Sequence, residues 1–186
     1  CAVIESGELT DRAKTRAKKI FRIVAEAEAR AHGLPIEQVH FHEVGAIDSI
    51  LDIVGAAVCL DDLGIERVVV ESIAEGSGTV RCAHGLLSVP VPAVANIASE
   101  HGLTLKNSGL RGELATPTGA AIAAAIRTAS ARPAAYRILR TGCGAGKREI
   151  GIPNILRAML VEEAPEERAP EGADGGVVVL EANVDD

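Results

Sequence analysis

The chain contains 186 residues, of which 47% are hydrophobic and 2% aromatic, and it carries a formal net charge of −7 at pH 7. This hydrophobic content is sufficient for a packed core, but no apolar run reaches the roughly 18–20 residues of a membrane span, and nothing resembles a signal peptide. We therefore expect a cytoplasmic protein that does not bind a membrane. We also expect no binding of nucleic acid, because a nucleic-acid binder normally presents a basic face and aromatic stacking platforms.

Two long helices are predicted in the first third of the chain. The first spans residues 10–32, where Thr10 is a suitable N-cap and Gly33 a suitable end. A short extended segment at residues 38–43 leads into the second, at residues 46–63. Apolar residues at helical spacing form a stripe along the second helix: Ile47, Ile50, Leu51, Val54 and Val58.

The start of the second helix and the segment before it carry five potential metal ligands. In an extended segment side chains alternate between faces, so His40 and His42 would share one face, with Glu43 directly after them. Asp48 and Asp52 are about one helical turn apart, and their like charges repel unless a cation or an arginine lies between them. These residues predict a metal site. The alternative is that Asp48 complements the helix N-terminus, Asp52 is solvated and the histidines fill a turn.

Strands and helices alternate through the rest of the chain. Strands are predicted at residues 68–73, 103–105, 136–141 and 154–161, a hairpin at 79–89, and helices at 92–101 and 117–129. This alternation predicts an α/β fold with a mixed sheet and packed helices.

Composition predicts two domain boundaries near the end of the chain. Residues 1–161 form the predicted α/β domain, and residues 162–176 are acidic and contain prolines and glycines, as interdomain linkers do. Residues 177–186 begin a new strand, which we expect to be the first strand of a second, truncated domain. Because the sequence begins with Cys rather than Met, we expect a fragment of a longer protein.

Two further segments are candidates for binding an anion. The glycine-rich turn around Gly144 is followed by Lys147 and Arg148, a composition suited to a phosphate, although its spacing matches neither the P-loop nor the dinucleotide fingerprint. Thr116 and Thr118 present hydroxyl groups where a helix begins, which also suits an anion. A solvated hairpin and ordinary helix capping are the respective alternatives.

Cys82 and His84 would lie on one face of a strand, because they are two residues apart. The pair is weak support for a metal site unless the fold brings it near His40 and His42. The four cysteines are widely spaced and form no C-x-x-C pair, which argues against a disulfide scaffold or a structural zinc site.

Several of these motifs, taken in order, resemble the LarC family of nickel insertion proteins. The motifs are HFHEVGAIDSILDIVG at residues 40–55, GSG at 76–78, CAHG at 82–85, PVPA at 90–93 and TPTG at 116–119. The resemblance implies a CTP-dependent nickel cyclometallase, a lyase that inserts Ni²⁺ into pyridinium-3,5-bisthiocarboxylic acid mononucleotide to make the nickel-pincer cofactor of lactate racemase. CTP, with Mn²⁺ or Mg²⁺, would be bound mainly by the C-terminal domain.

The chemistry of the residues themselves suggests a division of roles in such a protein. Nickel would be held by His40, His42 and Glu43, with Asp48 and Asp52. Glu43 and His84 are candidate general bases, and Cys82 would assist transfer to the thiocarboxylate. The substrate phosphate would be held by Thr116, Thr118, Gly144, Lys147 and Arg148. We expect a homo-oligomer that hands its product to lactate racemase or a related apo-enzyme.

Three other classes of function fit the same residues. A non-catalytic nickel chaperone or storage module would use the histidines alone. A metal-dependent phosphohydrolase or nucleotidyltransferase would hold Mg²⁺ with Asp48 and Asp52. A purely structural domain would bind no specific metal.

Overall fold

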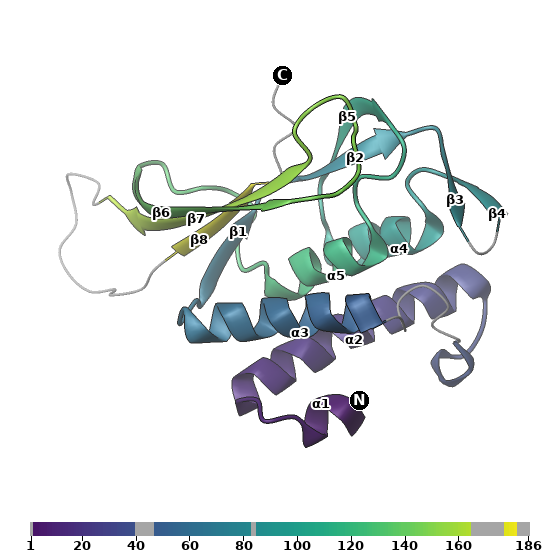
Figure 1. Cartoon of the computed structure of the whole chain (residues 1–186), viewed down its shortest axis with the longest axis horizontal. Helices are drawn as coiled ribbons and strands as arrows, with labels where there is room; N and C mark the ends of the chain where they lie inside the picture. Colours follow the sequence, from purple (N-terminus) through teal and green to yellow (C-terminus); the bar gives the residue numbers. More distant parts are fainter. Residues whose placement is uncertain (1, 40–46, 83–84, 165–176, 182–186) are drawn as a thin grey trace.

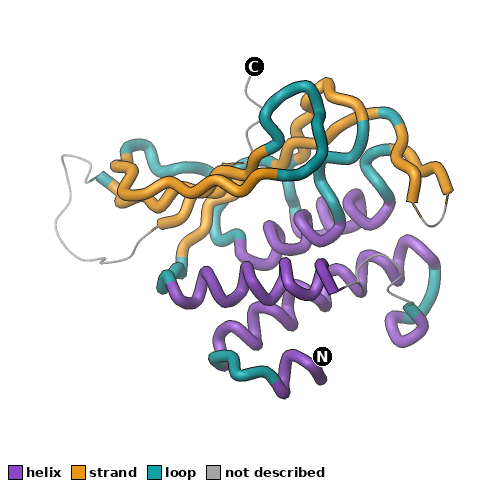
Figure 2. Tube along the Cα trace, in the orientation of Figure 1, coloured by secondary structure: helices purple, strands orange, loops and turns teal. Residues whose placement is uncertain are grey.

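A computed structural model describes residues 2–39, 47–82, 85–164 and 177–181. Strands form one side of the molecule and helices the other, with α4 and α5 next to the strands and α2 and α3 below them (Figures 1 and 2). The helices are α1 (Ala2–Ser6), α2 (Asp11–His32), the 3-10 turn η1 (Ile36–Gln38), α3 (Ile47–Asp62), α4 (Pro92–His101) and α5 (Pro117–Ile126). Among the helices in these described ranges, none combines the length and the apolar character that crossing a membrane requires.

The strands form one four-stranded sheet and two smaller pairs. They are β1 (Arg67–Val70), β2 (Ile73–Ser77), β3 (Thr79–Cys82), β4 (Gly85–Ser88), β5 (Leu105–Arg111), β6 (Tyr136–Ala145), β7 (Ile155–Glu163) and β8 (Val177–Glu181). The larger sheet has the order β1-β8-β7-β6, in which β1 and β8 are parallel and the other pairs antiparallel. β2 pairs with β5 in parallel, and β3 with β4 as an antiparallel hairpin. The predicted α/β class, with a mixed sheet and packed helices, is confirmed.

β8 lies between β1 and β7 in this sheet. It is the strand that the composition assigns to the start of a second domain. Most of the predicted linker lies outside the described residues, and β7 continues through Glu163. The division into domains therefore stays a prediction.

The main core is built around α2, which contacts α3, α4 and α5. Its central side chains, Ile20 and Val24, are fully buried, as are Ile53 of α3 and Val94 of α4. Small side chains fill much of the remaining interface, because the chain has very few aromatic residues. The helices consequently pack closely, and their relative positions are set by many aliphatic contacts.

The predicted caps at Thr10, Gly33 and Thr116 are confirmed, whereas the helix predicted to reach residue 129 ends at Ile126. The Thr10 hydroxyl accepts a hydrogen bond from the Ala13 N–H at 3.1 Å, and α2 ends at Gly33 in the left-handed region with φ 64°. The Thr116 hydroxyl likewise accepts from the Gly119 N–H at 3.1 Å. Each cap satisfies a backbone donor that a helix terminus leaves without an internal partner.

Three predicted strands are wrong in extent. The strand predicted at residues 136–141 is β6, which continues through Gly144 to Ala145, so most of the predicted glycine-rich turn is strand. The segment predicted as one strand at residues 68–73 is divided between β1 and β2, which belong to different sheets. The short strand predicted at residues 103–105 is instead β5, which runs to Arg111. The differences at β1, β2 and β5 follow from pairing with strands that are distant in the sequence.

Most of the apolar stripe predicted along α3 does not face the core, although Val54 packs against it. The buried residues of α3 are Ile53 and Ala57, which are not part of the stripe. Within the stripe, Ile47 is 77% and Leu51 65% exposed. The helix carries apolar residues on more than one side, so the spacing does not determine which side is buried.

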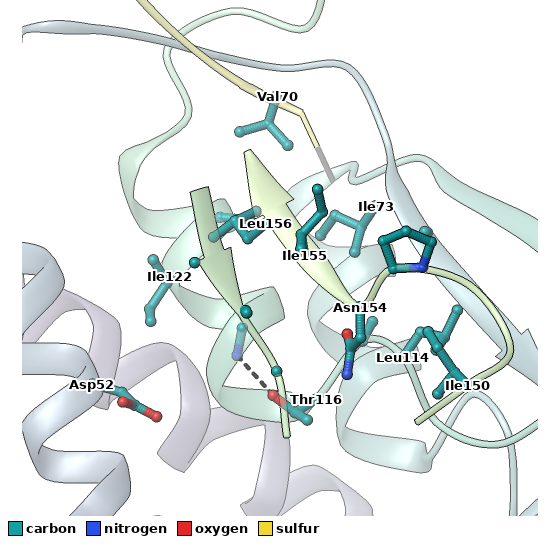
Figure 3. A pocket seen from close by; sticks show the side chains of 18 of the residues that line it. Asp52, Val70, Ile73, Leu114, Thr116, Ile122, Ile150, Asn154, Ile155 and Leu156 are labelled. Carbon is teal, nitrogen blue, oxygen red and sulfur yellow. Dashed lines mark hydrogen bonds between the residues drawn. The ribbon is translucent and has the colours of Figure 1, made fainter. Parts of the chain in front are cut away.

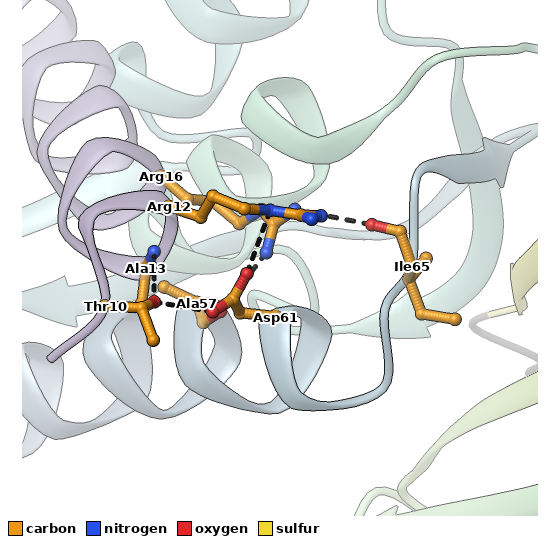
Figure 4. A network of polar contacts seen from close by, with 7 residues as sticks. All are labelled: Thr10, Arg12, Ala13, Arg16, Ala57, Asp61 and Ile65. Atoms are coloured by element: carbon orange, nitrogen blue, oxygen red, sulfur yellow. Dashed lines mark hydrogen bonds and ion pairs between the residues drawn. The ribbon is translucent and has the colours of Figure 1, made fainter.

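A polar network fixes α3 against the start of α2 (Figure 4). The Thr10 hydroxyl donates to Asp61 Oδ2 at 2.5 Å, and Arg12 Nε lies 3.0 Å from Asp61 Oδ1. Arg16 Nη1 donates to the carbonyl oxygen of Ala57 at 3.2 Å. These contacts, together with the buried Ile53, hold α3 so that the opposite end of the helix approaches the first turn of α5.

Candidate functional site

A cavity of about 580 Å³ lies between α3, the N-terminus of α5 and the ends of β6 and β7 (Figure 3). Most of its wall is aliphatic and is formed by Val70, Ile73, Leu114, Ile122, Ile150, Ile155 and Leu156. Polar side chains lining it are Asp52, Ser72, Thr116 and Asn154. A cavity of this size with a few polar groups is typical of a small-molecule site.

The first turn of α5 supplies the polar end of the cavity. Thr116 and Gly119 both line it, and the hydrogen bond between them is visible in Figure 3. Pro117 occupies the first helical position, where a missing N–H has no consequence. The helix dipole gives this end a partial positive charge, which attracts anions, although the Gly119 N–H is already bonded to Thr116. Thr118, predicted to act with Thr116, is half-buried and does not line the cavity.

The end of β6 and the glycine-rich turn that follows it form another wall. Gly144 and Gly146 line the cavity, and the Gly146 N–H donates to the Asn154 carbonyl oxygen at 2.8 Å. A Cβ at Gly146 would lie 2.4 Å from Asn154 Nδ2, so a side chain there would displace Asn154. Asn154 Nδ2 in turn donates to the Arg148 carbonyl oxygen at 3.1 Å, which closes the turn.

The two cations after this turn do not line the cavity. Arg148 donates to the carbonyl oxygen of Glu113 and so ties the turn to the segment that precedes α5. Lys147 is exposed on the same turn. Their predicted contact with a phosphate therefore requires side-chain movement, and it stays a prediction.

Of the predicted metal ligands, only the two aspartates lie within the described residues. Asp52 is exposed and lines the cavity from α3, whereas Asp48 accepts a hydrogen bond from the Ser49 N–H at 2.9 Å at the helix start. The predicted residues outside the described ranges are His40, His42, Glu43 and His84. Within the ranges that are described, no three His, Cys, Asp or Glu side chains are grouped to hold a metal.

Cys82 is half-buried at the end of β3 and is absent from the cavity lining. Its predicted partner in transfer, His84, lies outside the described residues. The assistance predicted for this pair therefore stays a prediction.

Two residues that the sequence does not single out belong to the surroundings of the cavity. Asn154 closes the glycine-rich turn, as described above. Glu75 is 4% exposed and is the one charged residue that is buried in the described part of the chain. No residue spacing marks Glu75, because its burial depends on a distant segment that includes Leu114. Asn154 instead bonds within its own turn, to Arg148, through a contact that no recognised motif marks.

Comparison with known proteins gives one consistent result. A family model described as "Nickel insertion protein" matches residues 1–186. The chain is 52% identical to "Pyridinium-3,5-bisthiocarboxylic acid mononucleotide nickel insertion protein" of Alkaliphilus metalliredigens, covering 99% of this chain and 46% of that protein. Identity to the protein of the same name from Akkermansia muciniphila is 48%, covering 99% and 44%. Identity to "Putative nickel insertion protein" of Geotalea daltonii is 47%, covering 100% and 46%.

The chain thus spans less than half the length of these curated relatives. No solved structure matches it.

Proposed function

Because the chain belongs to the nickel insertion protein family, we propose that it takes part in CTP-dependent insertion of Ni²⁺ into pyridinium-3,5-bisthiocarboxylic acid mononucleotide. The product would be the nickel-pincer cofactor of lactate racemase. The observation that carries this proposal is the 52% identity, over 99% of this chain, to a relative whose name states that substrate. Family membership itself confirms the resemblance found in the sequence motifs.

In this proposal the cavity holds the mononucleotide. Its aliphatic walls suit a flat ring, and the first turn of α5 suits a phosphate, because the helix dipole places partial positive charge there. Asp52 lies at the side of the cavity and would attract a positively charged ring. The cavity therefore combines an anion-binding end with a wall that favours a cation.

Nickel would be delivered from the α3 side of the cavity. His40, His42 and Glu43 would hold Ni²⁺ with Asp48 and Asp52, and mixed nitrogen and oxygen ligands permit its release to sulfur. A nickel–carbon bond replaces a ring C–H bond, so a base must accept the proton. This base would be Glu43 or His84, with Cys82 assisting the transfer.

Other parts of the proposal depend on the family resemblance alone. CTP, with Mg²⁺ or Mn²⁺, is cleaved during insertion and would bind mainly in the C-terminal domain. The protein would act in the cytoplasm as a homo-oligomer and pass its product to lactate racemase or a related apo-enzyme.

Nickel transfer followed by mass spectrometry tests the proposed function. The protein is loaded with Ni²⁺ and mixed with the bisthiocarboxylic acid mononucleotide, with and without CTP and Mg²⁺. The expected product has the mass of the mononucleotide plus one nickel, less the displaced protons, and forms only with CTP. Tight nickel binding without transfer would instead identify a chaperone. Preference for Mg²⁺ with nickel-independent CTP hydrolysis would identify a phosphohydrolase or nucleotidyltransferase.

Substitution of Lys147 by alanine should weaken binding of nicotinamide mononucleotide, a commercially available pyridinium mononucleotide, by up to about fivefold. An exposed charge near a phosphate contributes little more than this, because solvent screens it. Arg148→Ala should have a larger effect, since it also releases the turn from Glu113. Isothermal titration calorimetry measures both affinities.

Arg140→Ala is the matched control, because Arg140 is also exposed and lies on β6. If Lys147→Ala and Arg140→Ala weaken binding equally, the charge near the turn has no specific role in holding the phosphate.

A further inference from the structure

Glu75 has an unusual environment for a carboxylate. Its side chain is 4% exposed, and Oε1 accepts hydrogen bonds from the N–H groups of Gly76 at 2.7 Å and Leu114 at 3.5 Å. The other oxygen, Oε2, is buried and has no hydrogen-bond partner among the described residues. Burial of a polar group without a partner is unfavourable, so such a group in a folded protein calls for an explanation.

The position of Glu75 relates it to the cavity. It follows Ala74 on β2, and its carboxylate contacts the backbone of Leu114; both of these residues line the cavity. The carboxylate consequently lies directly behind the wall near Leu114. Figure 3 shows Leu114 and Asp52 on opposite sides of the cavity, so a carboxylate is associated with each side.

Nearby positive charge does not cancel the negative potential that the Glu75 carboxylate would create in the cavity. Among the lining residues of the described chain, none is Lys, Arg or His. Arg148 donates to the carbonyl oxygen of Glu113, next to Leu114, but it is exposed. Because solvent screens an exposed charge far more than a buried one, Glu75 dominates the potential on this side of the cavity.

We propose that Glu75 is a specificity-determining residue that makes the cavity select a positively charged ring over a neutral ring of the same shape. This inference rests on the proposed function, in which the cavity holds a pyridinium mononucleotide. A buried carboxylate behind an aliphatic wall attracts the ring charge without forming a direct contact. The selection therefore acts at a distance, while the wall determines which ring shape fits.

The test compares nicotinamide mononucleotide with its reduced dihydropyridine form. The two probes share the ribose and phosphate, and only the oxidised ring is positively charged. Wild-type protein should bind the oxidised probe about tenfold more tightly than the reduced one. Glu75→Gln should remove most of this preference by weakening the oxidised probe alone, because glutamine keeps the acceptor for Gly76 and Leu114. Calorimetry measures the four affinities.

Glu149→Gln is the matched control, since it removes one negative charge from an exposed position near the cavity and should leave the preference unchanged. Equal effects of Glu75→Gln on both probes, or no effect on either, would overturn the proposal. If neither probe binds wild-type protein, the assignment of the cavity to the mononucleotide fails first.

A measurement on wild-type protein replaces the variant if Glu75→Gln does not fold. The preference for the oxidised probe should persist in about 0.5 M salt, because a buried charge is poorly screened. Loss of the preference in salt would assign it to the exposed Asp52 and contradict the role of Glu75.

Discussion

Nickel affinity should fall by about a hundredfold or more when His40 and His42 are both replaced by alanine. Even residues that only orient a metal ligand typically change affinity by 10- to 100-fold, so removal of two direct ligands should exceed that range. Each single substitution should weaken binding by at least about tenfold. This loss is smaller than that of the double variant, because the remaining nitrogen and carboxylate ligands still hold the ion. Isothermal titration calorimetry with Ni²⁺ measures the effect.

His101→Ala is the matched control for this experiment. His101 lies in the last turn of α4 and is not part of the predicted metal site. It should leave nickel affinity unchanged. If the double variant binds nickel as tightly as the wild type, the predicted ligands are wrong, and a structural domain or a different metal site would have to be considered.

Residues of the candidate site could be predicted singly but not as a group. Asp52, Thr116 and Gly144 are each marked by a local pattern: a carboxylate pair, a helix cap and a glycine-rich turn. They belong to α3, the N-cap of α5 and β6, and only the fold places all three around one cavity. Nothing in the local sequence specifies such a convergence. Glu75 has no pattern at all, because its burial depends on the approach of the segment before α5.

The helices were predictable because their ends are encoded locally. Thr10 and Thr116 cap the first turns through their own side chains, and Gly33 adopts a left-handed conformation that other residues avoid. These interactions involve residues within about one turn of each other. The local sequence therefore specifies these interactions without any tertiary contact.

The limits of the strands depend on distant partners instead. β1 ends at Val70 because it pairs with β8, whereas β2 begins at Ile73 because it pairs with β5. The residues between them include no glycine or proline, so the local sequence gives no sign of the change of sheet. Which side of α3 is buried also depends on tertiary contacts. These contacts include the hydrogen bond from Arg16 of α2 to Ala57 and the ion pair of Arg12 with Asp61.

Replacement of Gly76 by alanine should destabilise the protein by at least about 3 kcal/mol, and the variant is expected to be largely unfolded or to lose the β2–β5 pair. A Cβ at Gly76 would lie 1.8 Å from the carbonyl oxygen of Gly112. This oxygen belongs to the backbone, and the Gly112 N–H is itself bonded to the Ser77 carbonyl oxygen at 2.8 Å. The clash therefore cannot be relieved by a side-chain rotation and requires β2 to separate from the segment that follows β5.

Gly55→Ala provides the matched control, because no atom lies within 4 Å of a Cβ built at this position in the interior of α3. Alanine there should be neutral or stabilising by up to about 1 kcal/mol, since it restricts the unfolded chain and favours the helix. Urea denaturation followed by far-ultraviolet circular dichroism measures both variants. A Gly76→Ala protein as stable as Gly55→Ala would contradict the close backbone approach between β2 and the segment that leads to α5. Since that approach also buries Glu75, the same result would remove the structural basis for its selection of a charged ring.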